Sequence, residues 1–130
     1  MKDILCLEDR DGCLFFTNSE GVQVVFLYYL ETNEKHIDSL VKEIDLPIAS
    51  IIRLYVHPNY RKLGWAKIIM NLFINKYNDC NIIVNAFPDD NDYMSIETLI
   101  SFYKGFGFDI LKPSEDGFLL YLNKINCIDL

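Results

Sequence analysis

The most regular hydrophobic pattern in the chain lies between residues 64 and 77. Apolar residues recur there every three or four positions, which is the period of a helix with one buried face. The residues on that face are Trp65, Ile68, Ile69, Leu72 and Phe73. We therefore predict a helix over 64–77 that packs this stripe against the core.

Two near-continuous apolar runs flank this helix, at residues 49–56 and 81–87. Such runs are typical of strands that are covered on both faces. A strand–helix–strand unit is joined by a right-handed crossover, which leaves its two strands parallel. We therefore predict that 49–56 and 81–87 form a central parallel pair.

The N-terminal part of the chain predicts antiparallel strands and one helix. Strands are expected at 4–8, 14–17 and 22–30, separated by turn-forming residues at 9–12 and 18–21. Short connections of this kind favour an antiparallel meander. Polar residues 33–44 carry apolar positions at helical spacing, so a short amphipathic helix should follow.

The C-terminal part predicts a second helix and a closing pair of strands. Ser95 can cap a helix that runs through Tyr103 and ends at Gly105 and Gly107. Strands are expected at 108–111 and 118–122. The last is apolar on both faces, so it is either a central strand or a surface buried against a partner chain. The pattern predicts one α/β (α+β) domain over 1–130, with a mixed, mostly antiparallel sheet and flanking helices.

Composition narrows the class of protein. The 130 residues carry a net charge of −7, which disfavours nucleic acid as a partner. No apolar run approaches the roughly 20 residues of a membrane span, and the N-terminus meets acidic residues too soon for a signal peptide. We expect a cytoplasmic protein that does not bind membranes.

The cysteine pattern argues against a metal centre. The four cysteines form no Cys-x-x-Cys pair, and the chain has only two histidines. Without a secretion signal, a disulfide framework is also disfavoured. We expect no metal, and free thiols at Cys6, Cys13, Cys80 and Cys127.

Charge is distributed unevenly along the sequence. No Asp or Glu occurs between Leu46 and Asn78, and the segment holds five cations. They are Arg53, Arg61, Lys62, Lys67 and Lys76. Asymmetry of this kind favours an anion site in this segment.

The junction between strand 49–56 and helix 64–77 has the chemistry of a phosphate site. A helix N-terminus offers unpaired N–H groups and a positive dipole end, and Gly64 would allow close approach to the backbone. Arg61 and Lys62 add charge. The sequence matches neither the Walker pattern nor the Gly-x-Gly-x-x-Gly fingerprint of dinucleotide sites.

Two motifs resemble those of the GNAT superfamily of N-acetyltransferases. Residues 54–66, with Arg61, Gly64 and Ala66 at the spaced positions, resemble its acetyl-coenzyme A motif, a strand ending in Val-x-Pro followed by Arg/Gln-x-x-Gly-x-Gly/Ala. Residues 99–108 resemble the second signature, in which a helix with an aromatic-Tyr pair ends in a Gly-Phe turn. The resemblance covers about residues 49–122.

The resemblance implies a set of coenzyme contacts. Strand 49–56 would splay from strand 81–87, and the pantetheine arm would lie in the gap. The backbone of Leu54 and Val56, on either side of Tyr55, would pair with it. The pyrophosphate would be held by N–H groups of Lys62, Leu63, Gly64, Trp65 and Ala66.

The resemblance also implies a reaction and its residues. Acetyl-coenzyme A would be the co-substrate, and a primary amine of a small molecule, polyamine or protein would be the acceptor, attacking directly in a ternary complex. Tyr103 matches the tyrosine that protonates the leaving thiolate. Glu31, Asp89 and Asp90 are candidates for the acceptor side, and a homodimer could complete the site.

Alternatives remain open at this point. Strand 49–56 contains no Asp or Glu to act as a base, Ile96 stands where many relatives carry an Asn, and His57 precedes a proline that closes the strand. A coenzyme-binding module without catalysis is therefore the second hypothesis. A plain scaffold with an incidental basic turn is the third.

Overall fold

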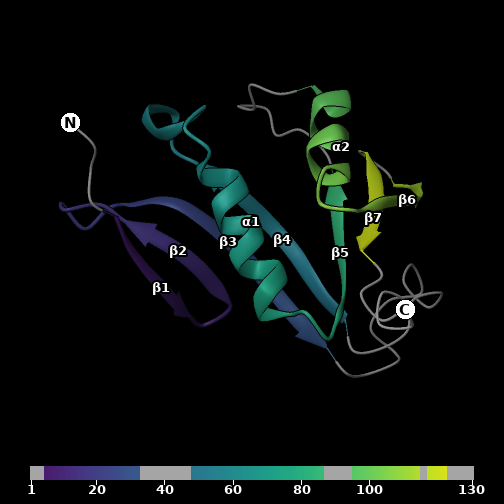
Figure 1. The fold of residues 1–130 in the computed structure, drawn as a ribbon, viewed down its shortest axis with the longest axis horizontal. Helices are drawn as coiled ribbons and strands as arrows, with labels where there is room; N and C mark the ends of the chain where they lie inside the picture. The colour runs from purple at the N-terminus through teal and green to yellow at the C-terminus, as the bar shows by residue number, and fades with distance from the viewer. Residues whose placement is uncertain (1–4, 33–47, 87–94, 115–116, 123–130) are drawn as a thin grey trace. The chain divides into compact units, whose positions relative to one another are not determined.

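The computed structural model describes residues 5–32, 48–86, 95–114 and 117–122. The predicted helix 33–44 lies outside these residues. The helices and strands are shown in Figure 1. They are β1 (Cys6–Arg10), β2 (Cys13–Thr17), β3 (Gln23–Thr32), β4 (Ile48–Val56), η2 (Pro58–Tyr60), α1 (Trp65–Lys76), β5 (Asn81–Ala86), α2 (Ile96–Lys104), β6 (Asp109–Pro113) and β7 (Phe118–Leu122).

The described strands form a mixed, mostly antiparallel sheet in the order β1-β2-β3-β4-β5-β7-β6, with β4 and β5 as a parallel pair. This confirms the predicted fold class. The chain divides into two compact units, Met1–Leu30 with Ile51–Asn78 and Glu31–Ser50 with Asp79–Leu130. The prediction of one domain over 1–130 stays a prediction, and each unit is described by itself.

The first unit begins with the β1–β2 hairpin. Asp11 and Gly12 both have positive φ, 53° and 78°, which is the backbone of the two-residue turn that suits the twist of a hairpin. Asp9 and Arg10 therefore pair with β2 and belong to β1. The predicted turn at 9–12 was two residues too long, because a two-residue turn needs only its central pair to leave the ladder.

Helix α1 packs its buried face on β3. Phe73 is fully buried, and its ring lies 5.3 Å from that of Tyr29. The prediction of this helix is confirmed, but its buried face is rotated relative to the stripe predicted from the sequence. Met70 is buried, whereas Ile68, which the sequence placed in the core, is 43% exposed. Periodicity locates an apolar stripe, but tertiary packing decides which edge of the stripe stays open.

An ionic contact fastens the edge strand β1 to the end of α1. Asp9 accepts hydrogen bonds from Lys76 and from the Tyr29 hydroxyl, the latter at 2.7 Å. Burial would raise the pKa of Asp9, but the bonds from Lys76 and Tyr29 and the Lys76 charge outweigh it and lower that pKa. The bond to Asp9 raises the pKa of Lys76.

We expect Asp9→Asn to lower the free energy of unfolding by about 0.5–1 kcal/mol at pH 7, the value of a partly exposed ion pair. Because the folded pKa of Asp9 is lowered, its contribution is present above the ordinary value of 3.8 and is lost as pH falls through the folded value. Urea unfolding of wild type and variant over a pH series tests this. Glu8→Gln is the control, and a loss that persists in strong acid would contradict the account.

The second unit is built on β5, β7 and β6. β7 lies between β5 and β6 and pairs with both in antiparallel register. The reading of 118–122 as a central strand is therefore confirmed. Ile48, Ile83 and Leu119 form a buried cluster there.

Helix α2 begins where the sequence predicted. The Ser95 hydroxyl accepts a hydrogen bond from the Thr98 N–H at 3.2 Å, which satisfies one of the free donors of the first turn. After the helix, Gly107 has a φ of 103°, which a residue with a side chain rarely adopts. Ser95 and Gly107 thus mark the helix start and the turn into β6.

Candidate functional site

β4 ends in a short 3₁₀ turn that the sequence did not predict. Pro58 sits in its first positions, and His57 caps it, with Nδ1 accepting a hydrogen bond from the Asn59 N–H at 3.1 Å. In the neutral ring, the proton therefore belongs on Nε2. Because the lone pair of Nδ1 is used by the backbone, this arrangement favours a structural role for His57 over a role as base.

Arg61 is anchored to the end of β4. Its Nε donates a hydrogen bond to the Val56 carbonyl at 3.0 Å, and its backbone N–H bonds to Pro58 at 3.4 Å. These two bonds hold the start of the loop 61–64 against the end of β4 and the η2 turn. The charge of Arg61 is thus kept close to the loop that follows.

The loop before α1 has an unusual backbone. Gly64 has a φ of 90°, and Lys62, which carries a side chain, has a φ of 64°. A lysine in this conformation is strained, and such strain is concentrated at functional sites. A Cβ added at Gly64 would meet no atom within 4 Å, so the space above this residue is open.

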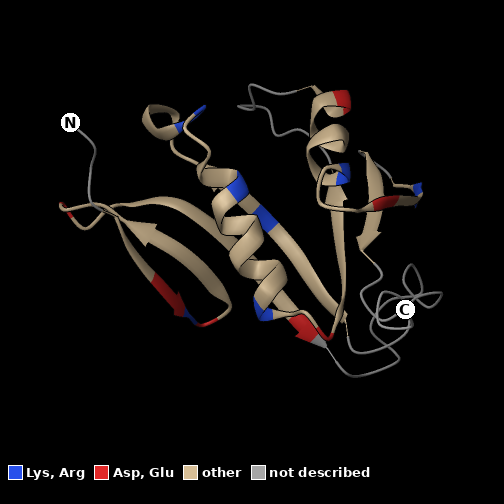
Figure 2. Ribbon diagram, in the orientation of Figure 1, with Lys and Arg blue, Asp and Glu red and all other residues tan. Residues whose placement is uncertain are grey.

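The first turn of α1 is free for an anion. Gly64 at the N-cap provides no side-chain hydrogen bond, and the first turn contains no acidic residue. The Ile68 N–H bonds to Gly64, which leaves the three preceding N–H groups at the positive end of the helix dipole. Figure 2 shows the basic residues around this loop and along α1. Open space, unpaired donors and positive charge together fit a pyrophosphate.

Tyr55 is one of the three β4 residues predicted to contact the coenzyme. In the structure its side chain packs against neighbouring side chains. Its ring stacks on Phe26 with centroids 5.0 Å apart, and the Arg53 guanidinium lies 5.6 Å from the Tyr55 centroid. The expected pairing of the Leu54 and Val56 backbone with pantetheine stays a prediction.

Tyr103 is buried in the second unit. It is 4% exposed, and its ring contacts Phe108 edge-on at 5.7 Å. Ring packing therefore fixes the orientation of this tyrosine. Its predicted role toward the coenzyme sulfur stays a prediction.

The acceptor candidates are only partly described. Glu31 is exposed at the end of β3, while Asp89 and Asp90 lie outside the described residues. Burial, then Asp79 and Glu31, raise the pKa of the nearby Cys80 thiol to about 11. Cys6, Cys13 and Cys80 are free thiols, of which Cys6 is exposed.

The described residues offer neither a metal-binding cluster nor a membrane-spanning helix. They contain no group of three or more His, Cys, Asp or Glu side chains that could hold a metal ion. None of their helices combines the length and the apolar character needed to cross a membrane.

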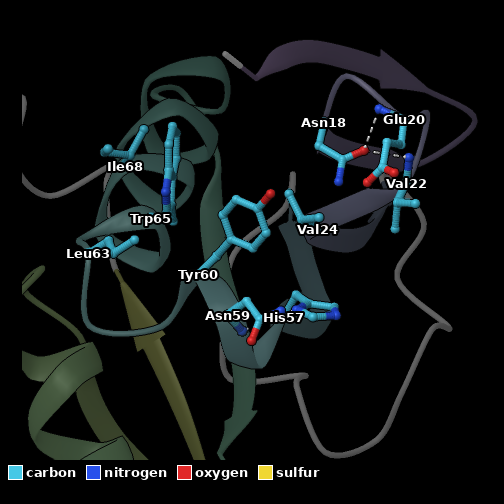
Figure 3. A pocket seen from close by; sticks show the side chains of 10 residues that line it. All are labelled: Asn18, Glu20, Val22, Val24, His57, Asn59, Tyr60, Leu63, Trp65 and Ile68. Atoms are coloured by element: carbon cyan, nitrogen blue, oxygen red, sulfur yellow. Dashed lines mark hydrogen bonds between the residues drawn. The ribbon is translucent and has the colours of Figure 1, made fainter. Parts of the chain in front are cut away.

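A pocket of about 1090 Å³ opens beside the loop, within the first unit. One wall is formed by Leu63, Trp65 and Ile68, as Figure 3 shows. The facing wall comes from the β2–β3 turn and the start of β3, and the base comes from His57 and the η2 turn. The ten lining residues are Asn18, Glu20, Val22, Val24, His57, Asn59, Tyr60, Leu63, Trp65 and Ile68.

Sequence patterns did not reveal this pocket. Residues 18–21 were predicted only as a turn, and Trp65 only as part of the helical stripe that packs against the core. Trp65 does pack on Phe16, with centroids 5.0 Å apart, but it also lines the pocket. Two segments far apart in the sequence, 18–24 and 57–68, meet here, and no local pattern in either segment predicts that they do.

A family model described as "Acetyltransferase (GNAT) family" matches residues 3–108. That range includes the loop 61–64, the first turn of α1 and Tyr103. The match agrees with the resemblance of the two motifs. No curated protein matches the sequence.

Solved structures share the fold at low sequence identity. A histone acetyltransferase HPA2-related protein from Corynebacterium glutamicum has a TM-score of 0.58 and 15% identity, over 84% of this chain and 62% of the other. The NatC complex bound to Gag peptide and CoA has a TM-score of 0.62 and 18% identity, over 85% and 70%. AtaT complexed with acetyl-methionyl-tRNAfMet has a TM-score of 0.63 and 16% identity, over 89% and 72%. The chain thus spans less than two thirds of the first protein and about 70% of the other two.

Proposed function

Because the chain belongs to the acetyltransferase (GNAT) family, we propose that it transfers an acetyl group from acetyl-coenzyme A to a primary amine. The observation that carries this proposal is the loop between β4 and α1. It combines an open glycine, a strained Lys62 and an uncapped helix start without acidic residues. These features fit the pyrophosphate of the coenzyme.

The neighbouring residues add to this fit. Arg61 is held at the strand end by its bond to Val56, so its charge needs little reordering when an anion arrives. Lys62 and Lys67 are exposed on either side of Gly64. In this proposal the N–H groups of Lys62, Leu63, Gly64, Trp65 and Ala66 bind the pyrophosphate oxygens.

The reaction requires that the amine and the thioester are positioned together and that protons are transferred. A neutral amine attacks the thioester carbon, a C–N bond forms, and the C–S bond breaks. The Tyr103 hydroxyl gives its proton to the leaving sulfur and recovers one from solvent. The amine loses its own proton to water or to a base. Orientation and stabilisation of the oxyanion by a backbone N–H would supply much of the rate.

The acceptor belongs to the class of primary amines. NatC was solved with a peptide and AtaT with an acetylated aminoacyl-tRNA, so this fold accommodates large acceptors. By analogy, we place a protein N-terminus or lysine alongside small amines and polyamines as candidates. Glu31 stays a candidate on the acceptor side.

Release of the coenzyme A thiol tests the proposed function. Wild-type protein is incubated with acetyl-coenzyme A and a panel of polyamines, small amines and peptides with free N-termini. We expect release that depends on one class of amine. A parallel thermal-shift series should show stabilisation of about 2–3 kcal/mol at a hundredfold excess of acetyl-coenzyme A over its dissociation constant.

A coenzyme-binding module without catalysis is the second candidate. It is favoured by the absence of any carboxylate in β4 and by the backbone bond that occupies Nδ1 of His57. Thermal stabilisation by acetyl-coenzyme A without thiol release on any amine would select this candidate. No stabilisation would reject both.

A further inference from the structure

We propose that the pocket beside the loop docks an apolar, basic peptide segment of the protein that carries the acceptor amine. The inference rests on the proposed function in one respect, because it names the class of acceptor. Binding itself requires no turnover, so the two can be tested apart.

The walls of the pocket are apolar and exposed. Val22, Leu63 and Ile68 are 47%, 65% and 43% exposed, and they are three of the eight large hydrophobic residues exposed in the described part of the chain. Trp65 and Tyr60 lie between them in Figure 3. A concentration of exposed apolar surface in one hollow marks a binding site. Apolar side chains of a ligand would cover it.

The polar groups of the pocket are held in place for an amide-containing ligand. Oδ1 of Asn18 accepts hydrogen bonds from the N–H groups of Glu20 and Val22, both at 3.0 Å, which leaves the Asn18 NH₂ as a donor. Nδ1 of His57 is used by Asn59, which leaves Nε2–H as a second donor. Two fixed donors suit the carbonyl groups of a peptide backbone.

Charge distinguishes a peptide from the nucleotide end of the coenzyme. Glu20 is the only Asp, Glu, Lys or Arg among the described lining residues. Phosphate groups are typically bound by Arg and Lys, whereas in this pocket they would lie beside a carboxylate. A basic side chain is the complement of Glu20.

The size of the pocket also favours a peptide as its ligand. The volume of about 1090 Å³ lies just above the roughly 300–1,000 Å³ typical of small-molecule sites. A segment of several residues would fill the pocket better than a small amine.

The single tryptophan of the chain makes this proposal directly measurable, because Trp65 lines the pocket. Tryptophan fluorescence is followed while a hexapeptide of leucine, phenylalanine and lysine, blocked at both ends, is added. We expect a saturable change with a dissociation constant below about 1 mM. The same peptide with glutamate in place of lysine should bind about two- to fivefold more weakly, and Glu20→Gln should remove that difference.

Matched variants locate the binding. Ile68→Ser should weaken the peptide about tenfold, because it removes apolar surface from the wall. Val22→Ser provides a second variant on the opposite wall. Ile110→Ser, at a residue of similar exposure (41%) outside the pocket, should leave peptide binding unchanged.

Competition separates this proposal from the proposed function. The peptide should bind equally well when acetyl-coenzyme A is saturating, and Ile68→Ser should not affect the coenzyme. If the coenzyme displaces the peptide and Ile68→Ser weakens the coenzyme, the pocket belongs to the coenzyme and the proposal fails. It also fails if no peptide changes the fluorescence of the folded protein. Loss of coenzyme binding alone would reject only the proposed function.

Discussion

Gly64→Asp is expected to weaken acetyl-coenzyme A binding by at least about tenfold, which corresponds to about 1.4 kcal/mol. The substitution adds a negative charge where the pyrophosphate is proposed to sit, and the two repel each other. The open space at Gly64 means that the new side chain meets no neighbour within 4 Å of its Cβ. The loss should therefore appear in affinity, as measured by calorimetric titration, and not in gross unfolding.

Gly21→Asp is the matched control. Gly21 has a φ of 81°, close to the 90° of Gly64, and a Cβ there also meets no atom within 4 Å. Both variants carry the same charge and a similar backbone cost of about 1–2 kcal/mol. Only Gly64→Asp should weaken the coenzyme. Equal affinities for the two variants would remove the loop from the coenzyme site.

Tyr103→Phe is expected to lower kcat by about a hundredfold or more while the affinity for acetyl-coenzyme A changes little. The reason is that the hydroxyl is proposed to act only when the thiolate leaves, and proton transfer of this kind typically contributes 10²–10⁴-fold. Single-turnover thiol release and coenzyme titration measure the two quantities separately.

Tyr77→Phe controls for the loss of a buried hydroxyl. Tyr77 is 7% exposed, against 4% for Tyr103, so both variants delete an oxygen from packed surroundings. A lowered stability shared by both variants, with kcat unchanged in Tyr103→Phe, would show that Tyr103 serves packing alone.

Local sequence patterns were sufficient for the elements that frame the loop. Apolar runs predict β4 and β5, and a change of the hydrophobic period to that of a helix predicts α1. The capping chemistry of Ser95 predicts the start of α2. Gly64 was recognisable because few other residues suit a close backbone approach at a helix start. Because these features depend on residues that are close in the sequence, they can be predicted from the sequence.

Features that depend on distant neighbours were not predictable. Lys62 carries no signal for its positive φ, because the surrounding structure imposes that conformation. Ile68, predicted to be buried, is exposed, and Met70, which lies outside the predicted stripe, is buried, because packing against β3 sets the rotation of α1. The pocket needs the β2–β3 turn beside Trp65, and only the folded chain brings them together.

Hydrogen exchange at the loop tests the central claim most directly. Amide exchange of the fragment covering residues 61–67 is measured in the free protein, with acetyl-coenzyme A, and with S-acetyl-pantetheine, which lacks the pyrophosphate. Because the backbone N–H groups are proposed to bind pyrophosphate oxygens, acetyl-coenzyme A should slow exchange in this fragment, and S-acetyl-pantetheine should not. Saturating acetyl-coenzyme A that leaves exchange at 61–67 unchanged would contradict the account.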